Sequence, residues 1–107
     1  MTRVSTHVLD TTTGTPAAGV AVVLRAPGGA ELASATTDAD GRVGALVDTA
    51  LAPGAYALAF ATGDWFARRG AAAFHPEVVV TFTVAGEDHL HVPLLLAPYA
   101  YSTYRGS

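Results

Sequence analysis

Two histidines near the end of the chain, His89 and His91, are the first residues whose type and spacing could do chemistry. Residues two apart on a strand point to the same side, so both imidazoles would occupy one face. The other face, from Leu90 to Leu96 in steps of two, is apolar and predicts burial against a core. Imidazole titrates near neutral pH and can act as an acid, a base or a metal ligand. The pair is therefore a functional candidate on a half-buried strand.

A third histidine and an arginine are weaker candidates when each is judged alone. His7 lies on a predicted strand, and a lone histidine on a strand is more often structural than functional. Arg42 directly follows a predicted Asp-Gly turn, where a charged residue in contact with water is commonplace. We interpret His89 as a residue at the rim of any site and His75 as a loop residue. Residue types and spacing alone do not decide among these four.

The last four residues, Tyr104, Arg105, Gly106 and Ser107, follow a predicted strand with no spacer. Chain ends are usually loose and dispensable, so an aromatic and cationic end that continues from a strand is a candidate for function. Glycine adopts backbone angles that a side chain forbids, and we expect Gly106 to let the end fold back toward a pocket for that reason. Tyr104 and Arg105 could also be surface residues of a terminal strand.

The elements that must position these residues are predicted to be short β-strands. Clusters of turn-forming residues separate runs rich in β-branched and aromatic residues. The predicted strands are Val4–Leu9, Val20–Arg25, Glu31–Thr37, Arg42–Val47, Ala55–Phe60, Val78–Val84, His89–Leu96 and a last strand after Ala97-Pro98. Strands that recur about every ten residues, with no helix–strand alternation, predict an all-β sandwich of about eight strands in two sheets.

One short helix is predicted between the strands. The polar residues Thr62, Gly63 and Asp64 could cap a helix over Trp65–Arg69, and Gly70 could end it. This segment is the only helical candidate in the chain.

Composition excludes several classes of protein. A length of 107 residues predicts a single domain over residues 1–107. The net charge of −3 offers no basic excess for nucleic acid, and the absence of cysteine excludes disulfides and thiolate metal sites. No apolar run approaches the roughly 18 residues of a membrane span, and the first residues lack the apolar segment of a signal peptide. We therefore expect a cytoplasmic protein.

Both ends of the chain resemble the transthyretin-like 5-hydroxyisourate hydrolase family of urate breakdown. The resemblance rests on Ser5–Asp10 at the start and on His89–Leu96 and Tyr104–Ser107 at the end. The closing Tyr-Arg-Gly-Ser is its most specific motif. Two positions differ, because Leu90 and His75 stand where the family usually has aromatic residues, and both differences concern packing rather than the polar positions. The first half alone resembles many prealbumin-like sandwiches, including modules that catalyse nothing.

The resemblance implies a transthyretin-like fold and an enzyme that hydrolyses 5-hydroxyisourate to 2-oxo-4-hydroxy-4-carboxy-5-ureidoimidazoline without a cofactor. Opening a cyclic acyl–nitrogen bond with water needs a base for the water and positive charge for the developing oxyanion. A nearby guanidinium also disfavours the imidazolium and so keeps an imidazole basic. The residues implied for catalysis are His7, Arg42, His91 and Ser107, and those implied for substrate binding are His7, Arg42, Tyr104, Arg105 and Gly106. Which histidine is the base stays open.

Three other functions are kept as alternatives. A transthyretin-type carrier of small ligands would need an apolar channel, and the histidines argue against one. A non-catalytic prealbumin-like module would have no need of the closing Tyr-Arg-Gly-Ser. A metal site is the third option, because His89 and His91 could both ligate zinc from one strand, but no cysteine is present and no carboxylate lies near them at ligand spacing.

The resemblance also implies a homotetramer with sites at the subunit junction. Half of the residues are hydrophobic and only 14% are charged, which agrees with a surface partly covered by another copy. The expected partners are thus the small-molecule substrate and other copies of the chain, with no nucleic acid and no membrane.

Overall fold

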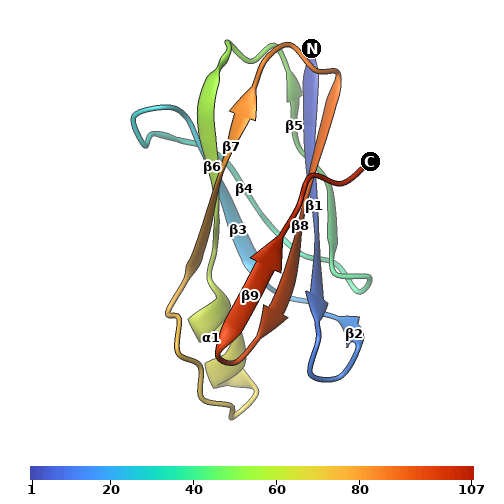
Figure 1. Cartoon of the computed structure of the whole chain (residues 1–107), viewed down its shortest axis with the longest axis vertical. Coiled ribbons are helices and arrows are strands. Elements are labelled where there is room, and N and C mark those ends of the chain that lie inside the picture. Colours follow the sequence, from blue (N-terminus) through green and yellow to red (C-terminus); the bar gives the residue numbers. More distant parts are fainter.

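A computed structural model describes residues 1–107 as two β-sheets packed face to face, with one short helix beside them (Figure 1). The strands are β1 (Thr2–Asp10), β2 (Thr15–Pro16), β3 (Ala21–Arg25), β4 (Glu31–Thr36), β5 (Arg42–Thr49), β6 (Gly54–Phe60), β7 (Val78–Val84), β8 (His89–Ala97) and β9 (Ala100–Thr103). The predicted all-β sandwich is confirmed. The one strand that the sequence did not predict is β2, two residues long inside a run of turn formers.

One sheet carries all of the histidine candidates except His75. Its strands follow the order β2-β1-β8-β9, and β5 pairs with the other edge of β1. The second sheet has the order β4-β3-β6-β7 and consists of antiparallel pairs. The predicted strands Val20–Arg25 and Glu31–Thr37 form the antiparallel β3–β4 pair, with Pro27, Gly28 and Gly29 in the turn between them. The first sheet is therefore the one that matters for the site.

The two ends of the chain meet in the parallel pair of β1 and β8, which lie side by side in Figure 1. Every other pair in this sheet is antiparallel. A parallel pair is usually predicted from a strand, a helix and a second strand that follow one another closely. Here most of the chain separates β1 from β8, so the sequence shows no such pattern. A buried threonine reinforces the pair, since the Thr6 hydroxyl donates to the Val92 carbonyl oxygen at 2.6 Å.

The core lies between the sheets and explains the alternation along β1 and β8. Val4 and Val8 on β1 are fully buried, and so is Leu94 on β8. The predicted apolar face from Leu90 to Leu96 is confirmed, because its residues all belong to the core cluster of 18 side chains. The opposite face of these strands, which carries the imidazoles, points away from the core.

The helix α1 (Thr62–Arg68) begins earlier than predicted and is not capped as predicted. Ala61 is the N-cap residue, and no side chain caps the helix, so the proposed capping by Thr62 and Asp64 is wrong. The predicted end is confirmed. Gly70 has a φ of +70°, its N–H donates to the Ala67 carbonyl oxygen, and the next N–H donates to Phe66, which is a Schellman motif.

Two further features of the chain were predicted correctly. The hairpin at Ala97-Pro98 joins β8 to β9, with a two-residue turn between the strands. The turn before β5 has Gly41 at a φ of +73°, as the Asp-Gly pair predicts. No helix of this structure has the length and apolarity needed to cross a membrane.

Candidate active site

The outer face of the first sheet brings three strands' polar side chains into register. His7 on β1 stands opposite Arg42 on β5 and opposite Pro93 on β8. Two residues earlier on β1, Ser5 stands opposite His91. Paired residues in a sheet project to the same face, so His7, Arg42 and His91 share one surface although most of the chain separates them. The parallel pairing of β1 with β8 is what brings them together.

Ser5 links the two histidines of β8. Its Oγ lies 2.7 Å from Nε2 of His89 and 2.8 Å from Nδ1 of His91. The serine is buried, with 5% of its surface exposed, whereas His89 is exposed and His91 is half-buried. Ser5 thus fixes the orientation of both rings from the inner side of the site.

The turn before β5 fixes the position of Arg42. The Asp38 Oδ1 accepts hydrogen bonds from the N–H groups of Asp40 and Arg42, at 2.9 and 3.0 Å. The Val8 N–H donates to the Gly41 carbonyl oxygen at 2.7 Å, and a Cβ on Gly41 would lie 2.5 Å from the Val8 carbonyl oxygen. Only glycine fits this approach of the turn to β1, and the approach holds Arg42 beside His7.

The surroundings of His91 lower its pKa below the ordinary histidine value. Burial is the main cause, followed by the positive charge of Arg42 and then by His89 and His7. The guanidinium of Arg42 acts in the expected direction, but burial has the larger effect on this pKa. A lowered pKa keeps His91 neutral, so a lone pair is available for taking a proton from water.

The chain end folds back onto His91, as expected, but for a different reason. The Gly106 N–H donates to the His91 carbonyl oxygen at 2.8 Å, and the two residues form an isolated β-bridge. Gly106 is not among the glycines with positive φ, so the predicted need for special backbone angles is wrong. Space is the real constraint, because a Cβ on Gly106 would lie 2.5 Å from Cδ2 of the His91 ring.

A pocket of about 170 Å³ opens where these elements meet, and we call it the histidine pocket. Its lining residues are Ser5, Thr6, Arg42, Val43, Gly44, His89, His91 and Ser107. It joins Arg42, His91 and Ser107, which are three of the four residues implied for catalysis. The fourth, His7, does not line the pocket but lies next to Arg42 in the sheet and close enough for its charge to affect His91.

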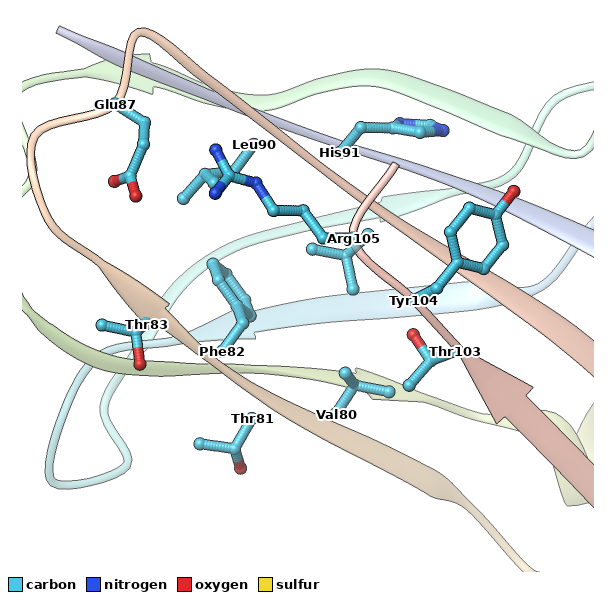
Figure 2. A pocket seen from close by; sticks show the side chains of 11 residues that line it. Val80, Thr81, Phe82, Thr83, Glu87, Leu90, His91, Thr103, Tyr104 and Arg105 are labelled. Atoms are coloured by element: carbon cyan, nitrogen blue, oxygen red, sulfur yellow. The ribbon is translucent and has the colours of Figure 1, made fainter. Parts of the chain in front are cut away.

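Tyr104 and Arg105 line a second and larger pocket of about 410 Å³, which we call the tail pocket. Its other lining residues are Val80, Thr81, Phe82, Thr83, Glu87, Leu90, His91, Val92 and Thr103. Figure 2 shows the Arg105 side chain extending past Leu90 toward Glu87, while the His91 ring points the other way. His91 is the one residue common to both pockets, so a single chain does not bring Arg105 and Arg42 into the same cavity.

The tail pocket is lined by one acidic side chain, Glu87, and one basic side chain, Arg105. Two backbone N–H groups, of Ala85 and of Glu87 itself, lower the pKa of the Glu87 carboxyl, and the positive charge of Arg105 adds to the effect. The Ala85 N–H donates to Glu87 Oε1 at 2.6 Å. Glu87 is therefore an anion that faces the cationic chain end across an apolar floor.

Comparison with known proteins matches residues 4–106 to the model of the HIUase/Transthyretin family. The chain belongs to that family. The resemblance inferred from both chain ends is thus confirmed. The family match also covers every residue that lines the histidine pocket except Ser107.

Several similar proteins of this family are named 5-hydroxyisourate hydrolase. The chain is 46% identical to the 5-hydroxyisourate hydrolase of Caulobacter vibrioides, over 100% of both sequences. It is 47% identical to that of Salmonella typhimurium, over 96% of this chain and 79% of the relative.

Solved structures of the family have the same fold. The 5-hydroxyisourate hydrolase of Klebsiella pneumoniae aligns with a TM-score of 0.91 and 44% identity, over 98% of this chain and 99% of that one. Sea bream transthyretin in complex with thyroxine aligns with a TM-score of 0.88 and 29% identity, over 97% and 94% of the two chains.

One member of the histidine pocket, Ser5, was part of the motif at the start of the chain but received no role from the sequence. His89 was interpreted as a residue at the rim of a site, and it is an exposed residue that lines this pocket. A signal for Ser5 was present, because it shares a strand face with His7 two residues away. No signal predicted its contact with His89, because that contact depends on the register of β1 against β8.

The two histidines considered for the metal alternative have ring centroids 6.2 Å apart, and Oγ of Ser5 contacts one nitrogen of each ring. No group of three or more His, Cys, Asp or Glu side chains gathers closely enough to hold a metal ion.

Proposed function

We propose that this chain is a 5-hydroxyisourate hydrolase, which adds water across the cyclic acyl–nitrogen bond of 5-hydroxyisourate and gives 2-oxo-4-hydroxy-4-carboxy-5-ureidoimidazoline. The observation that carries the proposal is the histidine pocket, in which Arg42, His91 and Ser107 meet from two strands and the chain end. The name of several relatives at 43–47% identity supports the same reaction. The chain is an enzyme of urate breakdown.

His91 and His7 handle the water and the protons in this proposal. The lowered pKa of His91 supports its part, because a neutral imidazole can accept a proton from the attacking water. The base and the polarising cation are both side chains of the protein, so the reaction needs no cofactor. Ser107 lines the same pocket as His91 and would orient the water.

Arg42 binds the substrate and polarises the carbonyl that the water attacks. A guanidinium stays charged and presents a planar fork of donors, which suits a ring rich in carbonyl oxygens. The positive charge next to the developing oxyanion would lower the barrier most in a pocket that excludes water. Gly44, which also lines the histidine pocket, leaves room for the ring, because a Cβ there would meet nothing within 4 Å.

Tyr104, Arg105 and Gly106 complete the substrate site in this proposal from the side of the chain end. Gly106 supports it directly through its packing on the His91 ring. Tyr104 and Arg105 border His91 from the tail pocket, so they would reach a substrate that extends past the ring or that binds between subunits.

We also propose a homotetramer with the sites at the subunit junction. Tyr99 in the β8–β9 turn, Tyr101 on β9 and Tyr104 at the chain end are exposed, and such an aromatic surface supports contact with another copy. Light scattering on the purified protein should give four chain masses. A monomer at the concentration of the activity assay would reject the tetramer and leave the single-chain pocket to be tested alone.

Two simpler expectations stay proposals. Residues 1–107 should unfold in one cooperative transition, as a single domain does. Fractionation of the source cells should recover the protein with cytoplasmic markers.

A carrier of small ligands is the alternative with a specific observation in its favour. The fold is shared with a transthyretin crystallised with thyroxine, and the tail pocket has a partly apolar lining of about 410 Å³. A carrier would bind thyroxine or a similar ring without converting 5-hydroxyisourate. Saturable binding together with an unchanged decay of 5-hydroxyisourate would favour this alternative.

The test of the proposed function is the ultraviolet decay of freshly generated 5-hydroxyisourate with and without the protein. This compound also decays unaided, so the difference in rate is the measured quantity. A rate that rises in proportion to protein concentration supports the hydrolase. Metal analysis of the same purified sample, with the assay repeated after a chelator, tests whether any activity depends on a bound ion.

A further inference from the structure

The hydroxyl of Ser5 is shared between two imidazoles. Nε2 of His89 and Nδ1 of His91 lie 2.7 and 2.8 Å from Oγ, and these are the only hydrogen bonds that this hydroxyl makes. Ser5 is more than nine-tenths buried, so water does not supply another partner easily. The three groups form a chain from the exposed His89 to the half-buried His91.

A hydroxyl has one hydrogen to donate, and this limits the protonation states of the two rings. If Ser5 donates to one facing nitrogen, the other facing nitrogen must carry the hydrogen and donate to Oγ. If both nitrogens lacked a hydrogen, one short contact would join two lone pairs. If both carried one, the buried hydroxyl hydrogen would have no acceptor, which is costly.

We propose that Ser5 and His89 are positioning residues that set the tautomer of His91, and that the charge of His89 determines which tautomer forms. Where it concerns catalysis, this inference rests on the proposed hydrolase function. The hydrogen-bond coupling itself does not.

The two arrangements have opposite consequences for the pocket. A neutral His89 permits the arrangement in which the Nδ1–H of His91 donates to Oγ and the hydroxyl donates to Nε2 of His89, so that Nε2 of His91 keeps its lone pair. With His89 protonated, its Nε2–H donates to Oγ, the hydroxyl donates to Nδ1 of His91, and the hydrogen of His91 sits on Nε2. Only the first arrangement leaves Nε2 of His91 able to accept a proton from water.

The two rings differ in their surroundings. Burial and the charge of Arg42 lower the pKa of His91 and keep that ring neutral, whereas the ring of His89 is exposed to water. Arg42 is the only permanently charged side chain that lines the histidine pocket. The other charged or titratable groups near the pair are Arg3 and His7 on β1, Asp48 on β5 opposite Arg3, Glu87 and Asp88 before β8, and Tyr104 and Arg105 at the chain end.

The first experiment measures the tautomer of His91 without any substrate. Long-range proton–nitrogen NMR spectra of the ¹⁵N-labelled protein are recorded from about pH 8 to about pH 5, where histidine changes charge. In the wild type, the ring hydrogen of His91 should move from Nδ1 to Nε2 as His89 takes up its proton. In Ser5→Ala the two titrations should be independent. A His91 tautomer that never changes, or that changes equally in Ser5→Ala, overturns the proposal.

The second experiment measures kcat/KM for 5-hydroxyisourate across the same pH range in Ser5→Ala, His89→Ala and the double variant. Each single variant should lose about tenfold at neutral pH, the scale of a hydrogen bond that acts through another group. Both should change the acid limb of the profile in the same way. The double variant should be no worse than the poorer single variant, because the residues act as one unit.

Matched controls and a second variant keep the outcome decisive. Ser34→Ala on the exposed strand β4 and His75→Ala in the loop before β7 should keep the wild-type profile. If Ser5→Ala melts far below the wild type, then Ser5→Thr, which keeps the hydroxyl, should restore the profile. Independent, additive losses or an unchanged acid limb would refute the coupling. A protein that does not hydrolyse 5-hydroxyisourate at all refutes the proposed function, and the NMR result still decides the coupling.

Discussion

At the residue scale, burial and charge act on His91 in the same direction. Removing the ring from water disfavours its cationic form, and the guanidinium of Arg42 disfavours it further. The ring is therefore neutral when it meets the water molecule that it has to deprotonate. A neutral imidazole next to a permanent cation is an arrangement that a structural histidine does not need.

The first prediction concerns the two histidines of the proposed proton network. His7→Asn and His91→Asn should each keep the fold and lower turnover about a hundredfold or more, the scale of losing acid–base help. The double variant should cost far less than the sum of the two losses, because residues that act as a unit are not additive. Steady-state kinetics on the three proteins checks this. Fully additive losses would mean that the two histidines act separately.

The second prediction separates a substrate-binding Arg42 from a turn residue. Arg42→Lys keeps the positive charge and, with its backbone N–H intact, keeps the hydrogen bond to Asp38. It loses the planar fork of donors, so kcat/KM should fall at least tenfold while the melting temperature stays the same. Kinetics like those of the wild type would remove Arg42 from the site.

At the element scale, the site exists because β1 and β8 pair in parallel and the chain end lies back along β8. The turn before β5 then adds Arg42 from the other side of β1. Each of these steps depends on close backbone approach, and glycine allows two of them. Gly41 makes room for the Val8 carbonyl oxygen, and Gly106 makes room for the His91 ring.

The third prediction compares the same substitution at two glycines. Gly106→Ala would put a Cβ 2.5 Å from Cδ2 of His91, so the ring or the chain end must move. Activity should fall tenfold or more with little change in stability. Gly70→Ala meets no atom within 4 Å but forces alanine to a φ of +70°, which should cost about 1 kcal/mol of stability and leave activity intact. Melting curves and decay assays on both variants check this, and an active Gly106→Ala protein would contradict it.

Much of the fold could be predicted from local patterns, and the rest depends on long-range pairing. The period-two alternation of β7 and β8 and the turn residues around Gly41 and Gly70 carry their structure in the local sequence. The parallel β1–β8 pair does not, because hydrogen bonding between distant strands leaves no mark in either one. The N-terminus of α1 was predicted wrongly because a local signal was misleading. Thr62 is a residue type that often caps helices, but its hydroxyl is buried without a hydrogen-bond partner.

The candidate site also has a part that could be predicted from the sequence and a part that required the structure. The residue types of His7, His91 and the chain end were visible in the sequence, and the resemblance added Arg42. The role of Ser5 required the register, and the separation of Arg105 from Arg42 into two pockets required the path of the chain end. A side chain's direction after a short terminal strand cannot be derived from residue spacing.

At the scale of the whole molecule, the two sheets have different tasks. The β4-β3-β6-β7 sheet supplies eight of the 18 core residues and none of the histidine pocket, whereas strands of the other sheet and the chain end line that pocket. Folding places His91 on the partly buried outer face of the latter sheet, and its pKa there differs from the value in the unfolded chain. Stability should therefore depend on pH.

The fourth prediction gives the sign of that dependence. The pKa of His91 is lower in the folded protein than its ordinary value of 6.5, so below about pH 6.5 the unfolded chain binds this proton more readily. The free energy of unfolding should fall as the pH drops through this value toward the folded-state pKa. Denaturant unfolding at fixed protein concentration should show a smaller loss for His91→Gln than for the wild type. Equal losses would mean that the folded state does not disfavour the protonated ring.

The measurement that tests the central claim most directly is the decay rate of 5-hydroxyisourate with the wild type, His91→Asn and a control, His75→Asn. His75 packs edge-on against Phe74 and Tyr101, away from the histidine pocket. We predict that the wild type and the control accelerate the decay equally, in proportion to protein concentration. His91→Asn should be slower by about a hundredfold or more. A wild-type rate no faster than the unaided decay, or an equal rate for His91→Asn, would contradict the assignment of this pocket as the active site.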